Sequence, residues 1–154
     1  MFSVPAEYDT LLMKPTVDRF LKDPTAYDLC FNACIYLFHF CDVLAQFEGG
    51  KTEDVRQRIE KEDCLINVVH AVCTAAKHVV VQNQKLKYVG FRSEDAHVSR
   101  GAAFSDGSYY SDGSSHSDAP NVVRVTMPDS QNFDMSHVVK SVYTTITTKF
   151  IPRD

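Results

Sequence analysis

The sequence predicts a mainly α fold, an up-and-down bundle of about four helices with a β-hairpin inserted before the last helix. Three observations predict it. Apolar residues recur at helical spacing through long segments in both halves of the chain, polar and apolar residues alternate around 85–92 and 122–127, and turn residues separate these segments. A length of 154 residues suits one domain, so we treat 1–154 as a single domain.

The first two predicted helices cover about 5–22 and about 26–47. The first is poor in apolar residues and is split by Pro15, and it ends at Asp23-Pro24 because a residue before proline is pushed out of the α region. The second is strongly apolar and stops at Gly49-Gly50, where glycine supplies the C-terminal cap.

The third predicted helix is a single long one, from about 52 to 81. Its first two turns are densely charged with both signs, which is typical of a solvated surface. From Cys64 onward the segment is mostly apolar. We therefore expect a helix that is exposed at its start and buried at its end.

A β-hairpin is predicted over about 85–127. Lys85–Arg92 and Val122–Met127 alternate between polar and apolar residues, as half-buried strands do. The Ser, Gly and Asp-rich segment 105–118 is expected to be the hairpin tip. The alternative is a cation site built from the acids that recur every six residues, although the acid spacing of an EF-hand is absent; these acids are Asp106, Asp112 and Asp118.

The last predicted helix covers about 135–151. Met135, Val138, Val142 and Ile146 fall at helical spacing. The many β-branched residues of this segment would also suit a strand. Its length and the capping residue Asp134 favour a helix.

Composition points to a soluble cytoplasmic protein. The formal charge of −4 repels phosphate overall, so a DNA partner is not expected. Five cysteines, an odd number with no Cys-x-x-Cys pair, suggest a reducing compartment. The N-terminus has no features of a signal peptide, and the most apolar segment, Cys30–Phe47, is interrupted by polar residues. A membrane partner is therefore not expected either.

The candidate functional residues lie on two polar stripes of otherwise apolar helices. Asn67, His70, Lys77 and His78 share one face of the third helix with Thr74. His39 lies on the second helix, on one face with Asp28, Asn32, Tyr36 and Gln46. A lysine and imidazoles could bind a phosphate, and His70 or His78 could act as acid or base. The alternative is that each stripe is merely the solvent face of its helix, with the last two residues capping its end.

No metal or cofactor is expected. A site from His39, His70 and His137 would need three helices in register, and the Glu-x-x-His pairs of di-iron bundles are absent. The sequence also lacks a P-loop, a Gly-x-Gly-x-x-Gly loop and a Gly-x-Ser-x-Gly nucleophile motif.

The run Ala75-Ala76-Lys77-His78, followed by a hairpin and a closing helix, resembles a set of small bacterial proteins. Their layout is similar to the HEPN superfamily of four-helix bundles, some of which are RNases of toxin and phage-defence systems. Arg92 and His97 match the spacing of the HEPN ribonuclease signature, but they follow a predicted strand and not the start of a helix. The resemblance implies a bacterial protein that binds or cleaves RNA or binds a nucleotide.

A rival hypothesis from another class is a non-enzymatic protein–protein interaction module, or a homodimer, whose apolar surface is covered by a partner. The sequence leaves both hypotheses open.

Overall fold

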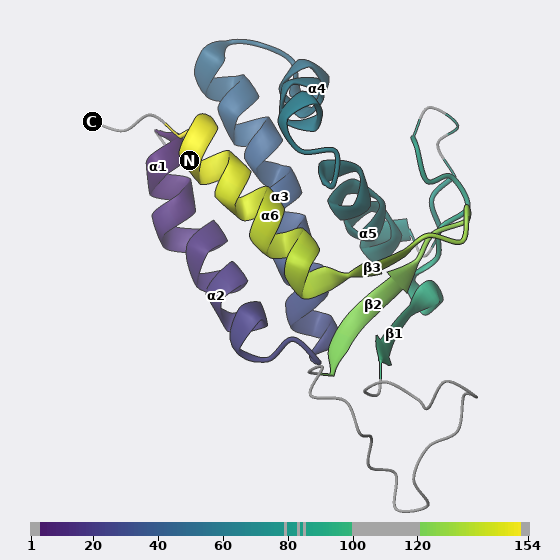
Figure 1. The fold of residues 1–154 in the computed structure, drawn as a ribbon. Helices are drawn as coiled ribbons and strands as arrows, with labels where there is room; N and C mark the ends of the chain where they lie inside the picture. Colours follow the sequence, from purple (N-terminus) through teal and green to yellow (C-terminus); the bar gives the residue numbers. More distant parts are fainter. Residues whose placement is uncertain (1–3, 79, 83, 85, 100–120, 152–154) are drawn as a thin grey trace, which may run out of the picture.

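The computed structural model describes residues 4–78, 80–82, 84, 86–99 and 121–151. The fold is mainly α, with a small antiparallel sheet before the last helix, as the sequence predicts. Helix α3 (Tyr27–Glu48) is central and contacts every other α-helix. Figure 1 shows the N-terminal helices on one side of α3 and helices α4 and α5 on the other. Helix α6 crosses in front of α3, and the sheet lies at the lower end of α6.

The first helical segment is continuous, so the predicted split at Pro15 is wrong. It consists of α1 (Pro5–Tyr8), a π-helical turn η1 (Asp9–Met13) and α2 (Lys14–Lys22). An ordinary α-helix interior would bring the proline ring against a carbonyl of the preceding turn. The wide π turn lies directly before Pro15, which stands in the first turn of α2. The proline therefore coincides with a widened turn and not with a helix end.

Helix α3 has nearly the predicted bounds. Gly49 follows it in the left-handed conformation with φ of 70°, and the N–H of Gly50 donates to the carbonyl of Ala45 at 2.8 Å. The helix is long and apolar enough to cross a membrane, with a mean hydropathy of 1.4 over its most apolar window. The core helix of a soluble protein meets the same criteria, and α3 is packed on by helices from both sides.

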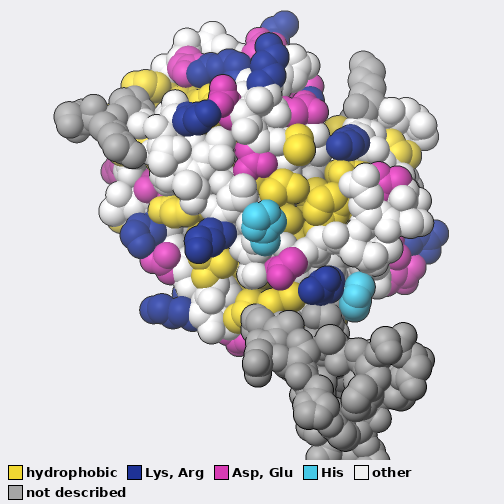
Figure 2. Space-filling view, in the orientation of Figure 1, with side chains coloured by type: hydrophobic (Ala, Val, Ile, Leu, Met, Phe, Trp, Pro, Cys, Tyr) yellow, Lys and Arg dark blue, Asp and Glu magenta, His cyan; other side chains and the backbone are white. Residues whose placement is uncertain are grey.

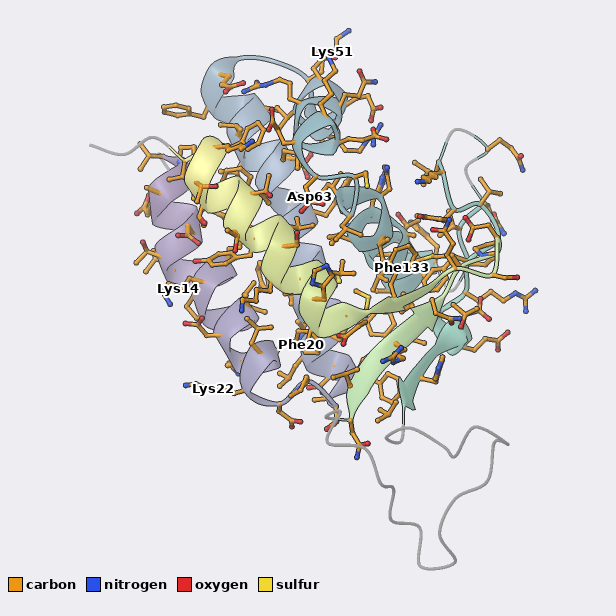
Figure 3. All side chains as sticks on the ribbon, in the orientation of Figure 1. Lys14, Phe20, Lys22, Lys51, Asp63 and Phe133 are labelled. Atoms are coloured by element: carbon orange, nitrogen blue, oxygen red, sulfur yellow. The ribbon has the colours of Figure 1, made fainter. Side chains whose placement is uncertain are left out.

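The predicted single helix over 52–81 is wrong, because two helices occupy this segment. Helix α4 (Thr52–Glu62) and helix α5 (Ile66–His78) are separated by a turn at Asp63. The Asp63 carboxylate accepts hydrogen bonds from the backbone N–H of Leu65 and from the hydroxyl of Ser141 on α6. Figure 3 places Asp63 beside α6 at this turn. Aspartate competes with helical hydrogen bonding in this way, and it ends one helix while it starts the next.

The first predicted strand, over 85–92, is also wrong. Residues 86–90 form bends and turns, and the strand lies later, at β1 (Ala96–Ser99). Tyr88 and Phe91 are both buried although they are three residues apart, which a turn allows, whereas a strand would place them on opposite faces. Gly90, with φ of 89°, allows that turn.

The second predicted strand is confirmed as β2 (Val122–Thr126), and a third, β3 (Asn132–Asp134), was not predicted. The sheet order is β1-β2-β3, with Val98 opposite Val123 and Val125 opposite Phe133. The expected hairpin tip and its three aspartates lie outside the described residues.

Helix α6 (Met135–Lys149) forms where the sequence predicts a helix. The side chain of Asp134 accepts hydrogen bonds from the N–H groups of Ser136 and His137, which is an N-terminal cap. Its buried face, together with the buried face of α3, forms much of the core. The β-branched residues of α6 are helical because this packing outweighs their strand propensity.

Candidate functional site

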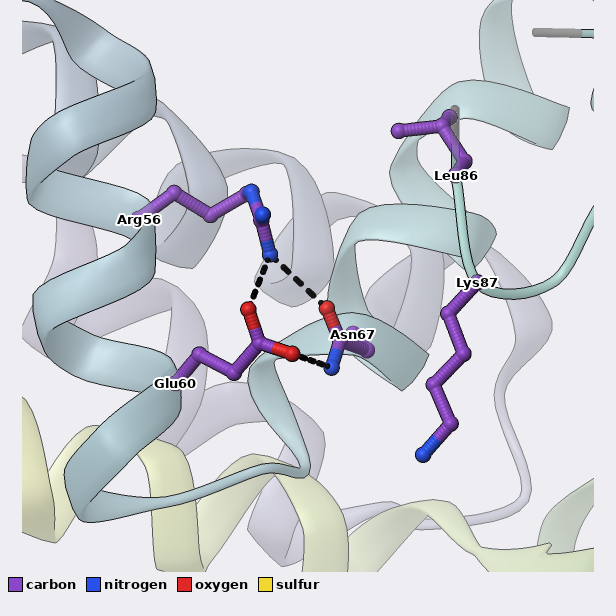
Figure 4. A pocket seen from close by; sticks show the side chains of 5 residues that line it. All are labelled: Arg56, Glu60, Asn67, Leu86 and Lys87. Atoms are coloured by element: carbon purple, nitrogen blue, oxygen red, sulfur yellow. Dashed lines mark hydrogen bonds and ion pairs between the residues drawn. The ribbon is translucent and has the colours of Figure 1, made fainter. Parts of the chain in front are cut away.

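A polar network joins α4 to α5 and forms the wall of a pocket (Figure 4). The Arg56 guanidinium donates to Glu60 at 2.8 Å and to the side-chain oxygen of Asn67 at 2.9 Å. The Asn67 amide donates in turn to the other oxygen of Glu60 at 2.8 Å. Arg56 also pairs with both carboxylate oxygens of Glu53 on its own helix. These bonds hold the three pocket-facing groups at fixed positions.

Burial explains why this network is well defined. Asn67 is the buried polar residue of the described core, with 7% of its surface exposed, and 13% of the Arg56 side chain is exposed. A buried polar group without partners would cost free energy, so the network satisfies groups that packing has removed from water. Loss of one member would leave the others unsatisfied.

Charges in the network shift the pKa values of its acids. Hydrogen bonds from Arg56 lower the pKa of Glu53 to about 2. The hydrogen bond from Asn67, followed by the interaction with Arg56, lowers the pKa of Glu60. Bonds to the two glutamates raise the pKa of Arg56 above its already high value. All three groups are therefore charged at neutral pH.

The pocket has a volume of about 230 Å³. Its lining combines the network with Leu86 and Lys87, which follow α5. Figure 4 shows the Lys87 side chain across the pocket from Arg56 and Glu60. Its ammonium lies 5.2 Å from the centre of the Tyr88 ring, a cation–π contact. The pocket therefore offers hydrogen-bond donors, acceptors and a lysine within a small volume.

His70, a predicted catalytic candidate, lies on the flank of this network. Its ring stacks on Phe38 of α3, with centroids 3.9 Å apart and planes 12° apart. Burial, followed by the charge of Arg56, lowers the pKa of His70 to about 4. The imidazole is neutral at pH 7, and a pKa so far from the working pH suits proton transfer poorly.

The other predicted residues are placed differently. Lys77 and His78 are exposed in the last turn of α5, and neither lines the pocket. His39 lies on α3, its Nε2 3.5 Å from Asp42, and it lines a different pocket. The structure therefore brings Asn67 and His70 together beside Arg56, and it does not add His39 to them.

The sequence did not identify Arg56, Glu60 and Lys87 as candidate site residues. The first two belong to the charged start of the predicted long helix and were interpreted as a solvated surface. One signal could have found them. Asn67 interrupts an apolar run, and a buried asparagine needs partners that the nearest charged segment can supply.

Neither the HEPN-like pair nor the histidine triad contributes to the lining of the pocket between α4 and α5. Arg92 precedes a short 3-10 turn and pairs with Glu94, whereas His97 is exposed on β1. In the part of the chain that the structure describes, no group of three or more His, Cys, Asp or Glu side chains could hold a metal ion. His39, His70 and His137 belong to α3, α5 and α6, respectively.

Comparisons with known proteins gave no match, whether to family models, to curated proteins or to solved structures.

Proposed function

We propose that the protein is a binding module that takes a nucleotide, free or within an RNA strand, at the pocket between α4 and α5. The observation that carries the proposal is the fixed Arg56–Glu60–Asn67 wall with Lys87 opposite it. The wall presents hydrogen-bond donors and acceptors together, as the edge of a heterocyclic base does.

The volume of the pocket limits the size of the ligand that it can hold. Pockets for whole drug-sized ligands usually measure about 300–1,000 Å³. A volume of about 230 Å³ suits one base, with sugar and phosphate outside it. Lys87 is exposed beside the pocket and could meet that phosphate. Glu53 and Glu60 together carry more negative charge than Arg56 carries positive charge, so the wall itself does not attract a phosphate and recognition would depend on the base as well as on Lys87.

We propose binding without catalysis. His70 is neutral, stacked and half-buried, which supports a packing role. The HEPN resemblance stays a prediction about layout. The carboxylate that lines this pocket, Glu60, is held by Arg56 and Asn67, and the lowering of its pKa makes it a weaker base for RNA cleavage near neutral pH.

The test is binding of fluorescently labelled AMP and of a short single-stranded RNA, measured by fluorescence anisotropy. We expect both to bind the wild type, and Lys87→Ala to weaken binding about tenfold while the melting temperature changes little. Lys61→Ala, which removes an exposed lysine from α4, is the matched control. No binding by the wild type, or equal losses in the two variants, would refute the proposal.

A second candidate is the non-enzymatic interaction module or homodimer. Figure 2 shows hydrophobic side chains gathered on the face between α5 and α6, with charged and histidine side chains around them. Apolar side chains gathered on one face favour a protein partner. The exposed large hydrophobic residues of the described chain belong to elements other than α5 and α6; they are Val4, Leu11, Tyr27 and Phe47. Sedimentation equilibrium of the whole chain tests the homodimer, and a monomer at micromolar concentration would exclude it there.

A further inference from the structure

A second, larger pocket of about 410 Å³ lies between the N-terminal helical segment and α3. Its apolar walls come from Tyr8 on α1, Leu12 on the π turn, and Tyr36 and Val43 on α3. The Tyr8 hydroxyl donates to the backbone carbonyl of Tyr36 at 2.9 Å, and the two rings lie 6.4 Å apart between centroids. Tyr8 is 1% exposed, so this aromatic wall is held in place.

The π turn that carries Leu12 is a second feature of this pocket. A π turn is rare in helices and is found frequently at functional sites. Here it widens the first helical segment at the point where that segment lines the pocket.

The polar side of the pocket is negatively charged. It consists of His39, Asp42 and Gln46, which follow one face of α3. Asp42 accepts a hydrogen bond from the Thr52 hydroxyl at 2.6 Å, which orients its carboxylate. Asp42 is the acid among the lining residues, and the Nε2 of His39 lies 3.5 Å from its other carboxylate oxygen. The lining contains neither lysine nor arginine.

The field of this carboxylate reaches the aromatic wall. The pKa of Tyr8 is raised, mainly by burial and then by the neighbouring Tyr36 and Asp42. A negative field disfavours a phenolate, and for the same reason it favours a cation in the pocket.

We propose that this pocket binds a small organic cation with an apolar body, such as an aryl or alkyl ammonium compound. The body would lie against the tyrosines and Val43, and the ammonium group would face Asp42. Aromatic rings attract such cations by their quadrupole, and a carboxylate adds direct charge complementarity. None of these residues lines the nucleotide pocket, so binding of a cation here does not depend on the proposed binding of a nucleotide.

The test is a charge series of ligands of one size: benzylamine, benzyl alcohol and benzoate. Dissociation constants at pH 8 are measured by NMR chemical-shift titration on the whole protein. We expect benzylamine to bind about tenfold more tightly than benzyl alcohol, and benzoate to bind most weakly. Equal affinities, or no shift at millimolar concentration, would overturn the proposal. This comparison uses the wild type and needs no variant to fold.

Two variants test whether the ligands bind in this pocket. Asp42→Asn should remove most of the preference for benzylamine over benzyl alcohol, whereas Asp28→Asn, an exposed aspartate on α3 outside the pocket, should keep it. Val43→Trp should fill the pocket and abolish the binding of all three ligands. A preference for the cation that survives Asp42→Asn, or binding that survives Val43→Trp in a folded variant, would contradict the proposed site.

Discussion

Helices α3 and α5 are both apolar and each carries a narrow polar stripe, yet the two stripes have different surroundings. On α3 the stripe residues Asp28, Asn32 and His39 are exposed. On α5 the stripe begins with the buried Asn67 and ends with the exposed Lys77. The difference is caused by α4, which places Arg56 and Glu60 over the start of α5. A polar stripe on an apolar helix is therefore exposed to solvent unless another element with polar side chains packs on it.

The largest loss of stability is expected when a charge is introduced on the apolar face of α5. Val69→Asp should destabilise the domain by several kcal/mol or unfold it, because an unpaired carboxylate would replace a fully buried side chain. Asn32→Asp, on the exposed stripe of α3, should change little. Chemical denaturation of both variants measures the difference, and similar free energies of unfolding would show that the two faces are misassigned.

Removing Arg56 should have the next largest effect. Arg56→Ala leaves Glu53, Glu60 and Asn67 without their shared partner, and we expect a loss of about 1–3 kcal/mol in the free energy of unfolding. The control is Arg58→Ala, two residues along α4, which removes a more exposed pair with Glu48. That variant should lose less than about 1 kcal/mol. Equal losses would mean that the network is no more than a surface ion pair.

The buried imidazole of His70 should have an effect on stability that appears only as the pH decreases. Its pKa is about 4 in the folded protein, below the value of 6.5 for a free imidazole. The unfolded chain therefore binds more protons below pH 6.5, and stability should fall as the pH decreases from about 6.5 to 4. His70→Phe keeps a ring beside Phe38 and should reduce this fall. Urea denaturation at pH 7 and pH 4.5 measures this loss of stability. Identical pH dependences in the wild type and His70→Phe would refute its assignment to His70.

The smallest effect on stability is expected from modifying the exposed thiol. All five cysteines are free, and Cys64, between α4 and α5, is the exposed one. Burial raises the pKa of Cys41 to about 12, and that of Cys34 is raised by its hydrogen bond with Cys30 and by burial. A thiol reagent should therefore modify one cysteine in the native protein and five after denaturation, with little change in the melting temperature. Rapid modification of several native thiols would contradict the burial of α3.

Three elements could be predicted because the signals that define them are local. Helix α3 is predicted by its apolar periodicity and ends at Gly49, and α6 begins at the cap provided by Asp134. Strand β2 alternates and stops before Pro128. In each case propensity, pattern and capping agree, so neighbouring residues suffice to define the element.

The remaining features depend on contacts between elements that are far apart in the sequence. Asp63 interrupts the predicted long helix because it accepts hydrogen bonds from α6, which lies far along the chain. Segment 85–92 alternates as a strand does, but Tyr88 and Phe91, which a strand would place on opposite faces, are both buried by the core from a turn. Arg56 belongs to a pocket because α4 folds back on α5 and meets Asn67. These outcomes depend on contacts between distant residues, and local periodicity carries no information about which polar groups such contacts remove from water.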